Sequence, residues 1–147
     1  YLAAQSATGA EVVVLWQGHD GLVMKPWAHY LITSTTWANG GTPDGDDVLM
    51  ASVPSGFKME LLTFDGASKA TVDGLCAYRT DEELAVLAAP SSGCDGTPVH
   101  NPADVSSFAL ERLPGFNSGH CQDNDHSAAD FYWHVATPTN SAAPPTQ

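Results

Sequence analysis

Residues 57–79, FKMELLTFDGASKATVDGLCAYR, decide which fold this chain is predicted to have. Along Phe57–Phe64 successive side chains alternate between two faces, as they do in a β-strand. Asp65-Gly66 comes next, and this dipeptide accepts the positive φ angles that a tight type I′ hairpin turn requires. The stretch is therefore predicted to form a hairpin, with a further turn at Asp73-Gly74.

The Asp-Gly dipeptide recurs along the chain and extends this prediction beyond the first hairpin. Its five occurrences begin at Asp20, Asp44, Asp65, Asp73 and Asp95. Such pairs are typical of the tight connections between neighbouring antiparallel strands. The chain as a whole is therefore predicted to be built from antiparallel hairpins.

Further strands are expected where β-branched and aromatic residues gather. Glu11–Gln17, EVVVLWQ, is a continuous apolar run, which is typical of a central strand buried on both faces. Other strands are predicted at Trp27–Trp37, Val48–Val53 and Asp130–Thr137. Residues 1–10 are interpreted as a lead-in, and residues 39–47 and 115–129 as loops.

Two short helices are expected in the connections. Thr80-Asp81-Glu82-Glu83 matches a capping box, so residues 84–89 are predicted to be helical, with a strand through ELAVLAA as the alternative. Asn101 followed by Pro102 is a helix-start signal, and apolar residues at three- and four-residue spacing continue to Leu113. Residues 102–113 are therefore predicted as the second helix.

These elements together predict a mainly β fold. The expected architecture is an antiparallel β-sandwich or jelly-roll-like domain with one or two short helices in its connections. Residues 1–140 are expected to form a single β-rich domain, because 147 residues with 43% hydrophobic content suit one core. Residues 141–147, SAAPPTQ, have the composition of a mobile tail.

The charge balance excludes several classes of partner. Seventeen acidic and five basic residues give a net charge of −12. Nucleic acids and anionic membrane surfaces are bound mainly through Lys and Arg, so neither is an expected partner. Membrane insertion is not expected either, because no run approaches the roughly 18 apolar residues of a spanning helix. An acidic exterior does suit a protein that collects divalent cations.

Three cysteines leave one without a partner inside the chain. Cys94 and Cys121 lie in turn-rich segments, SSGCDG and SGHCQD, where a disulfide would restrict loops, whereas Cys76 lies in the strand-like LCAY. A Cys94–Cys121 disulfide with Cys76 buried and free is therefore predicted, which implies an oxidising compartment. Three reduced thiols in a cytosolic or viral protein are the alternative.

The segment 119–130, GHCQDNDHSAAD, concentrates groups that bind metals. Its side chains offer nitrogen, sulfur and oxygen donors that suit zinc, or calcium if the carboxylates converge. The candidate ligands are His120, Asp123, Asp125 and His126, with Cys121 and Asp130 beside them. The spacing matches no EF-hand or zinc motif, so a solvated loop rich in Asx turns is the preferred interpretation.

Thr42–Asp47, TPDGDD, is a second acidic loop. Asp44, Asp46 and Asp47 are candidate ligands for a hard cation, which two subunits meeting there would share. The simpler interpretation is a hydrophilic hairpin end. The expected cofactor is accordingly none, or a divalent cation, with calcium preferred to zinc.

Aromatic residues are the candidates for a contact surface. Aromatic side chains present large flat areas at low entropic cost. In DFYWHV, Tyr132 and His134 share one strand face, and the opposite face carries Phe131 and Trp133. The predicted contact residues are Trp27, Trp37, Tyr132 and His134.

The function favoured by the sequence is not enzymatic. No Gly-x-Ser-x-Gly or comparable local signature marks a nucleophile. The expectation is a structural or attachment β-domain of an assembly: a virus coat projection or decoration domain, or an extracellular filament subunit. Its partners would be proteins, above all copies of itself, at a virion surface or outside the cell. The alternative is a small secreted metal-dependent hydrolase or lectin-like binding protein that uses residues 119–130.

Overall fold

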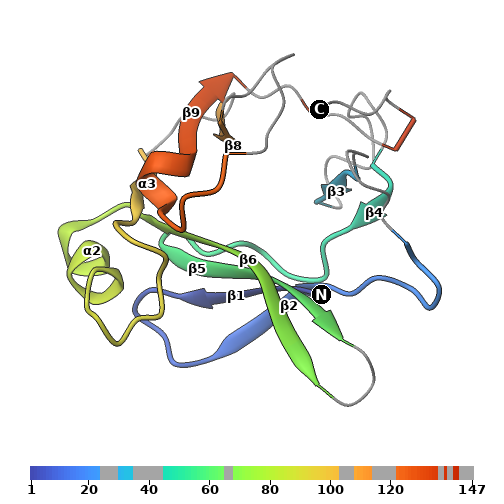
Figure 1. Cartoon of the computed structure of the whole chain (residues 1–147), viewed down its shortest axis with the longest axis horizontal. Helices are drawn as coiled ribbons and strands as arrows, with labels where there is room; N and C mark the ends of the chain where they lie inside the picture. Colours follow the sequence, from blue (N-terminus) through green and yellow to red (C-terminus); the bar gives the residue numbers. More distant parts are fainter. Residues whose placement is uncertain are drawn as a thin grey trace.

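The long hairpin at the centre of the chain is the scaffold of the computed structural model (Figure 1). β5 (Phe57–Phe64) and β6 (Lys69–Tyr78) pair antiparallel, from Phe57 opposite Ala77 to Phe64 opposite Lys69. The predicted hairpin is therefore confirmed, with a connection over 65–68 in place of a two-residue turn. The structure describes residues 1–23, 30–34, 45–64, 68–102, 108–113, 122–135, 138 and 141–142, so Asp65-Gly66 itself lies outside it.

The second Asp-Gly of the hairpin is not a turn, and that prediction is wrong. Asp73 and Gly74 lie inside β6, and the register shifts beside them, where an extra residue forms a β-bulge. A Cβ added at Gly74 would come within 2.9 Å of the Asp95 carboxylate. The glycine therefore serves a close approach of the 95–96 loop to the strand.

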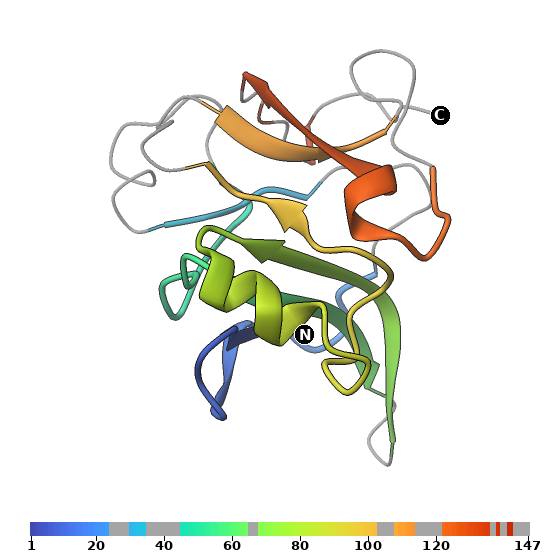
Figure 2. The ribbon, with the colours of Figure 1, turned by 90° about the vertical axis from the view of Figure 1, so that its left-hand side faces the viewer.

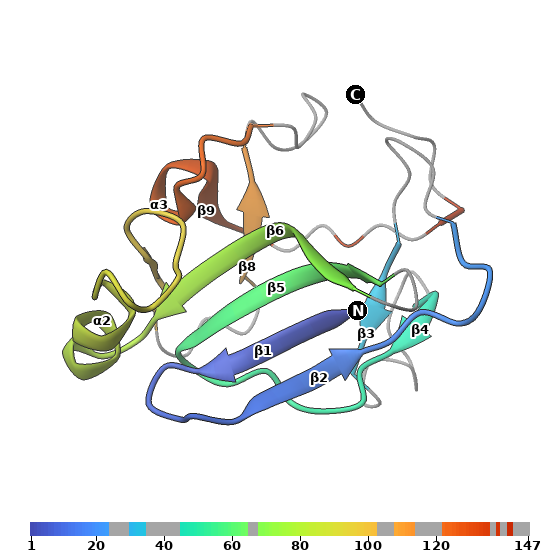
Figure 3. The same cartoon turned by 60° about the horizontal axis from the view of Figure 1, so that its bottom comes forward.

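The hairpin forms part of a five-stranded sheet with the order β2-β1-β5-β6-β7 (Figure 3). β1 (Leu2–Ser6) pairs antiparallel with both β5 and β2 (Val12–Trp16). The predicted lead-in thus contains a strand. The apolar run of 11–17 does form a strand, but it lies at the edge of this sheet and not at its centre.

The remaining strands pair in both parallel and antiparallel directions. β7 (Val99–His100) pairs parallel with β6, and β3 (Ile32–Thr33) pairs parallel with β4 (Asp47–Val48). β8 (Phe108–Arg112) pairs antiparallel with β9 (Phe131–Val135). The mainly β class is confirmed, and the large sheet is mixed.

α2 (Asp81–Leu87) confirms the predicted capping box. The Thr80 side chain accepts a hydrogen bond from the Glu83 backbone N–H, and the Glu83 carboxylate accepts one from the Thr80 N–H. The same carboxylate accepts the Arg79 N–H at 2.7 Å and the Ser55 hydroxyl at 3.2 Å. Glu83 therefore joins the start of α2 to the segment that precedes β5.

The prediction of a helix over 102–113 is wrong, because 108–112 form β8. A strand forms here instead of the predicted helix because it packs Leu110 against the core cluster of Phe57, Ala77 and Val99. Sequence spacing also missed α3 (Ser127–Asp130), which spans the end of the predicted 115–129 loop and the first residue of the predicted 130–137 strand. No helix in the described ranges is long and apolar enough to cross a membrane.

Core clusters lie on both faces of the sheet. The β8–β9 hairpin covers one face near β6 and β7, while α2 lies near one end of the sheet (Figure 2). Around α2 the buried residues are Ala7, Cys76 and Leu87. The loop over 93–95 also lies on that second face, beside Lys58 and Gly74, and the described residues place no further helix or strand over β1 and β5 there (Figure 3). We call this second face the open face.

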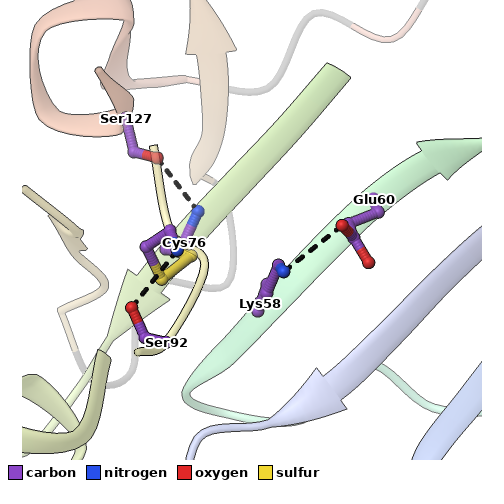
Figure 4. The surroundings of a disulfide bond; sticks show 6 residues. Lys58, Glu60, Cys76, Ser92 and Ser127 are labelled. Carbon is purple, nitrogen blue, oxygen red and sulfur yellow. Dashed lines mark hydrogen bonds and ion pairs between the residues drawn. A yellow bond between two sulfur atoms is a disulfide. The ribbon is translucent and has the colours of Figure 1, made fainter. Parts of the chain in front are cut away.

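A disulfide joins Cys76 of β6 to Cys94, with a Cα–Cα distance of 5.8 Å (Figure 4). The predicted Cys94–Cys121 pair is therefore wrong, and Cys121 lies outside the described residues. The reason is topological: the chain returns past β6 after α2, only 18 residues further on. The Cys76 N–H also donates to the Ser127 hydroxyl at 3.1 Å, so α3 is attached at the same point.

This pairing predicts a specific loss of stability on Cys76→Ser substitution. Opening a loop with a sequence separation of 18 residues should lower the free energy of unfolding by about 3 kcal/mol. Urea unfolding monitored by fluorescence measures this change, and Cys121→Ser is the matched control, expected to leave the stability of the disulfide-bonded chain unchanged. A non-reduced digest that links Cys94 to Cys121 would contradict the assignment.

Candidate functional site

The outer edge of β2 is the first feature of the candidate site. The side chains of Val12 and Val14 are 59% and 38% exposed, whereas Leu15 and Trp16 are buried. A turn that is closed by the Gly9 N–H and the Ser6 carbonyl at 3.1 Å connects β1 to this strand. β2 thus presents two β-branched side chains to water at a sheet edge.

Described residues cover the far end of that edge. The Met50 N–H donates to the Leu15 carbonyl at 2.7 Å, and the Trp16 indole donates to Asp47 at 2.7 Å. Within the described ranges, no strand pairs with the outer side of β2. We call Val12–Val14 the free edge.

The register shows what lies beside the free edge on the open face. Val12 is opposite Gln5, which is opposite Lys58, and Val14 is opposite Ala3, which is opposite Glu60. Paired residues in a sheet point to the same side, so both valines share the open face with Lys58 and Glu60. The open face therefore passes from apolar at its edge to charged at its middle.

Lys58 and Glu60 form an ion pair at 3.3 Å on β5, next to the disulfide (Figure 4). Two shallow hollows of about 240 and 450 Å³ flank the Lys58 side chain. Gly93, with φ +69°, passes so close that a Cβ there would lie 2.8 Å from the Lys58 ammonium. About half of the residues that line these hollows are polar, among them Lys58, Glu60 and Asp95. They provide hydrogen-bonding groups and one ion pair beside the free edge.

Asp46, a predicted cation ligand, holds two distant segments together. Its carboxylate accepts the Leu31 N–H and the Ser141 N–H, each at 2.8 Å, and the Ser141 hydroxyl. Burial acts to raise the pKa of Asp46, but these hydrogen bonds outweigh it and lower the pKa. Ser141, where the predicted tail begins, is thus tied to the β3–β4 region.

The Asp47 carboxylate also accepts hydrogen bonds from other groups of the protein. The hydrogen bond from Trp16 and one from the Val48 N–H lower the pKa of Asp47 against the effect of burial. Tyr30 lies against Trp16 with ring centroids 5.6 Å apart, and burial followed by the charge of Asp47 raises the Tyr30 pKa. Hydrogen-bond donors of the protein therefore occupy carboxylate oxygens of both Asp46 and Asp47. Asp44, the third predicted ligand, lies outside the described residues.

The 122–130 segment is organised around Asp130, which is 2% exposed. Its carboxylate accepts the Asn124 N–H at 2.8 Å, the Asn124 side-chain amide at 2.6 Å and the His126 N–H at 3.1 Å. Burial acts to raise the pKa of Asp130, yet these hydrogen bonds lower it. The Asp130 carboxylate therefore accepts the backbone N–H groups that a backbone carbonyl would accept in a regular helix or strand.

Two other predicted metal ligands of this segment, His126 and Asp123, have structural roles. His126 is the N-cap of α3, where its Nδ1 accepts the Ala129 N–H at 3.2 Å. Asp123 lies 3.6 Å from the Arg112 guanidinium, and Asp125 has a positive φ of 52°. His120 lies outside the described residues. In the described part of the chain, no three His, Cys, Asp or Glu side chains are grouped to hold a metal ion.

Of the predicted aromatic contact residues, the structure describes the strand β9. The Tyr132 hydroxyl donates to Glu111 at 3.5 Å, and burial together with this carboxylate raises the Tyr132 pKa. His134 pairs with Ala109 in the ladder. Trp133 pairs with Leu110, whose side chain packs towards the sheet, so Tyr132 lies on the opposite face of the hairpin. Trp27 and Trp37 lie outside the described residues.

Sequence reasoning missed two features that the structure makes important. Arg112 contacts Asp73 of β6, donates to the Gln122 carbonyl at 2.8 Å and lies 4.4 Å from the centroid of the Phe131 ring. The spacing of 102–113 predicts a helix and so gives no signal for this role. The apolar run of 11–17 predicts that Val12 and Val14 are buried, whereas pairing with the strand Leu2–Ser6, whose small residues give no strand signal, places them at an edge.

Comparisons with protein-family models, with curated proteins and with solved structures find no match. The candidate site must therefore be interpreted from its own chemistry. The described residues present a strand edge and an open sheet face, and their buried carboxylates are engaged by the protein itself.

Asp130→Asn should destabilise the protein in a pH-dependent way. The amide keeps the shape but faces the N–H donors with a weaker acceptor, which should cost about 1–3 kcal/mol at neutral pH. The folded pKa of Asp130 lies below its unfolded value, so its stabilisation is full above the usual Asp pKa of about 3.9. That stabilisation is lost as the pH falls through the folded value.

Urea unfolding of the wild type and Asp130→Asn across acid and neutral pH measures this effect. The difference should begin to narrow below about pH 4, where Asp130 of the unfolded chain takes up a proton, and should close as the pH falls through the lowered pKa of the folded carboxyl. Asp123→Asn is the control, because its side chain is 57% exposed and surface pairs contribute little. A difference that is independent of pH, or equal losses in the two variants, would contradict the assigned role of Asp130.

Proposed function

We propose that this chain is a non-enzymatic structural or attachment domain that binds protein partners by adding a strand to the free edge of β2. The observation that carries the proposal is a mismatch between sequence and position. VVVLW has the β-branched, continuous apolar character of a central strand, yet the strand lies at the edge of its sheet. A partner strand would make it central.

The free edge also lacks the features that keep sheet edges from pairing. Edge strands are commonly protected by Lys, Pro or a covering segment. Val12–Val14 contains no charge and no proline, and Glu11 is the nearest charged side chain along the chain. Added strands gain affinity from backbone hydrogen bonds, and burying an exposed valine contributes about 1 kcal/mol more.

The open face supports an assembly role. A partner that extends the sheet past Val12 would also lie beside the Lys58–Glu60 pair and its flanking hollows, which offer polar contacts at the rim. In such an assembly the β8–β9 hairpin over the other face would be one layer of a β-sandwich or jelly-roll-like arrangement. The proposal needs no cofactor.

The proposed setting is a virion surface or the outside of a cell. The Cys76–Cys94 disulfide supports an oxidising environment, and the net charge of −12 supports contact with proteins over contact with nucleic acid. A coat projection or decoration domain and a filament subunit both fit, because each presents β-edges to neighbours. Copies of the chain itself are the first partners to consider.

Titration with strand-forming peptides tests the proposal directly. Two heptapeptides with alternating Val and Thr, one flanked by Lys and one by Glu, are added while backbone amide chemical shifts are recorded. The shifts should centre on Val12–Val14, and the Lys-flanked peptide should bind more tightly because the protein is acidic.

The matched variants of this titration are Val12→Lys and Val72→Lys, whose valines are 59% and 55% exposed. Val12→Lys should weaken binding of the peptide and Val72→Lys should not, although both make the same charge change. The proposal fails if neither peptide shifts the β2 amides and the chain shows no association with itself.

A further inference from the structure

We infer that the partner at the free edge is a second copy of this chain, paired antiparallel through β2 about a two-fold axis at Val13. The inference rests on the proposed strand addition and specifies its partner. It would join two five-stranded sheets into one continuous sheet with a common open face.

The free edge is complementary to itself. An antiparallel pair centred on Val13 places Val12 of each copy opposite Val14 of the other, and Val13 opposite Val13. All three cross-strand pairs are therefore valine with valine, and β-branched pairs of this kind stabilise sheets. A two-fold contact requires such a patch, in which the same surface meets itself.

Accessibility sets the length of this pairing. Val12 and Val14 lie on the open face, and β2 is the outermost strand there (Figure 3). The Met50 N–H occupies the Leu15 carbonyl, which ends the free edge on that side. Pairing centred on Val13 uses 12–14 and stops before Leu15, so it displaces no hydrogen bond of the described structure.

Charge decides the direction of the two strands. In a parallel pair the two Glu11 carboxylates would be adjacent, at a strand spacing of about 4.8 Å. In the antiparallel pair they lie at opposite ends, offset along the strand by about 14 Å at 3.4 Å per residue. This separation exceeds the Debye length of about 8 Å at physiological salt. The antiparallel arrangement therefore avoids their repulsion.

The net charge of the chain also distinguishes a second copy from a basic partner of another sequence. Residues 1–23 contain no Lys or Arg, and each copy carries a net charge of −12. Two copies therefore repel at long range while their valines attract at contact, so screening by salt must strengthen the dimer. A basic partner of another sequence would show the opposite dependence.

Sedimentation equilibrium of the full chain tests the inference, from about 0.01 M to about 1 M sodium chloride, which shortens the Debye length from about 30 to 3 Å. A monomer–dimer equilibrium is expected, with a dissociation constant that falls as salt rises. Val12→Lys should raise the dissociation constant at least about tenfold, equal to about 1.4 kcal/mol. Val72→Lys, with the same added charge on the same sheet, should dimerise as the wild type does.

Circular dichroism of both variants checks that each is folded before it is compared. A chain that stays monomeric at all salt concentrations, a dimer that salt weakens, or a dimer indifferent to Val12→Lys overturns the inference. If the chain is monomeric but the Lys-flanked peptide still binds β2, strand addition stands and the partner is a basic protein of another sequence. If neither binds, both proposals fall.

Discussion

The pairing of β6 with its neighbours is the interaction on which the rest of the structure depends. β6 lies against β5 on one side and β7 on the other. The same strand carries Cys76, whose disulfide fixes the loop after α2 and whose N–H donates to Ser127 of α3, and Asp73, whose carboxylate pairs with Arg112 of β8. Both core clusters include a residue of this strand. The large sheet, α2, α3 and the β8–β9 hairpin are therefore all attached to one strand, while the β3–β4 pair is joined to β2 through the Trp16–Asp47 hydrogen bond.

The acidic composition has a structural use that explains why the predicted ligands do not form a metal site in the described ranges. Asp46, Glu83 and Asp130 each accept backbone N–H groups that lie outside regular pairing. A carboxylate can satisfy several donors at once, which suits a chain with many irregular connections. These acids therefore connect segments of the protein.

Local signals predicted those parts of the fold that depend on neighbouring residues. The alternation of Phe57–Phe64 and the capping box at Thr80 are contained in a few residues, and both were predicted correctly. The partners of Leu110 and Cys94 come from distant parts of the chain, so spacing alone assigned the wrong element and the wrong disulfide. The position of Val12 at an edge likewise depends on Leu2–Ser6, whose small residues resemble a loop.

The central claim is that Val12–Val14 is an edge that β2 of a second copy of this chain completes. Amide hydrogen exchange, measured residue by residue in dilute and concentrated solutions, tests this most directly. The account predicts that the outward-facing amides of this edge exchange quickly when dilute and slowly when concentrated, while amides shared by β5 and β6 stay slow throughout. Exchange at Val12–Val14 that does not change with protein concentration would contradict it.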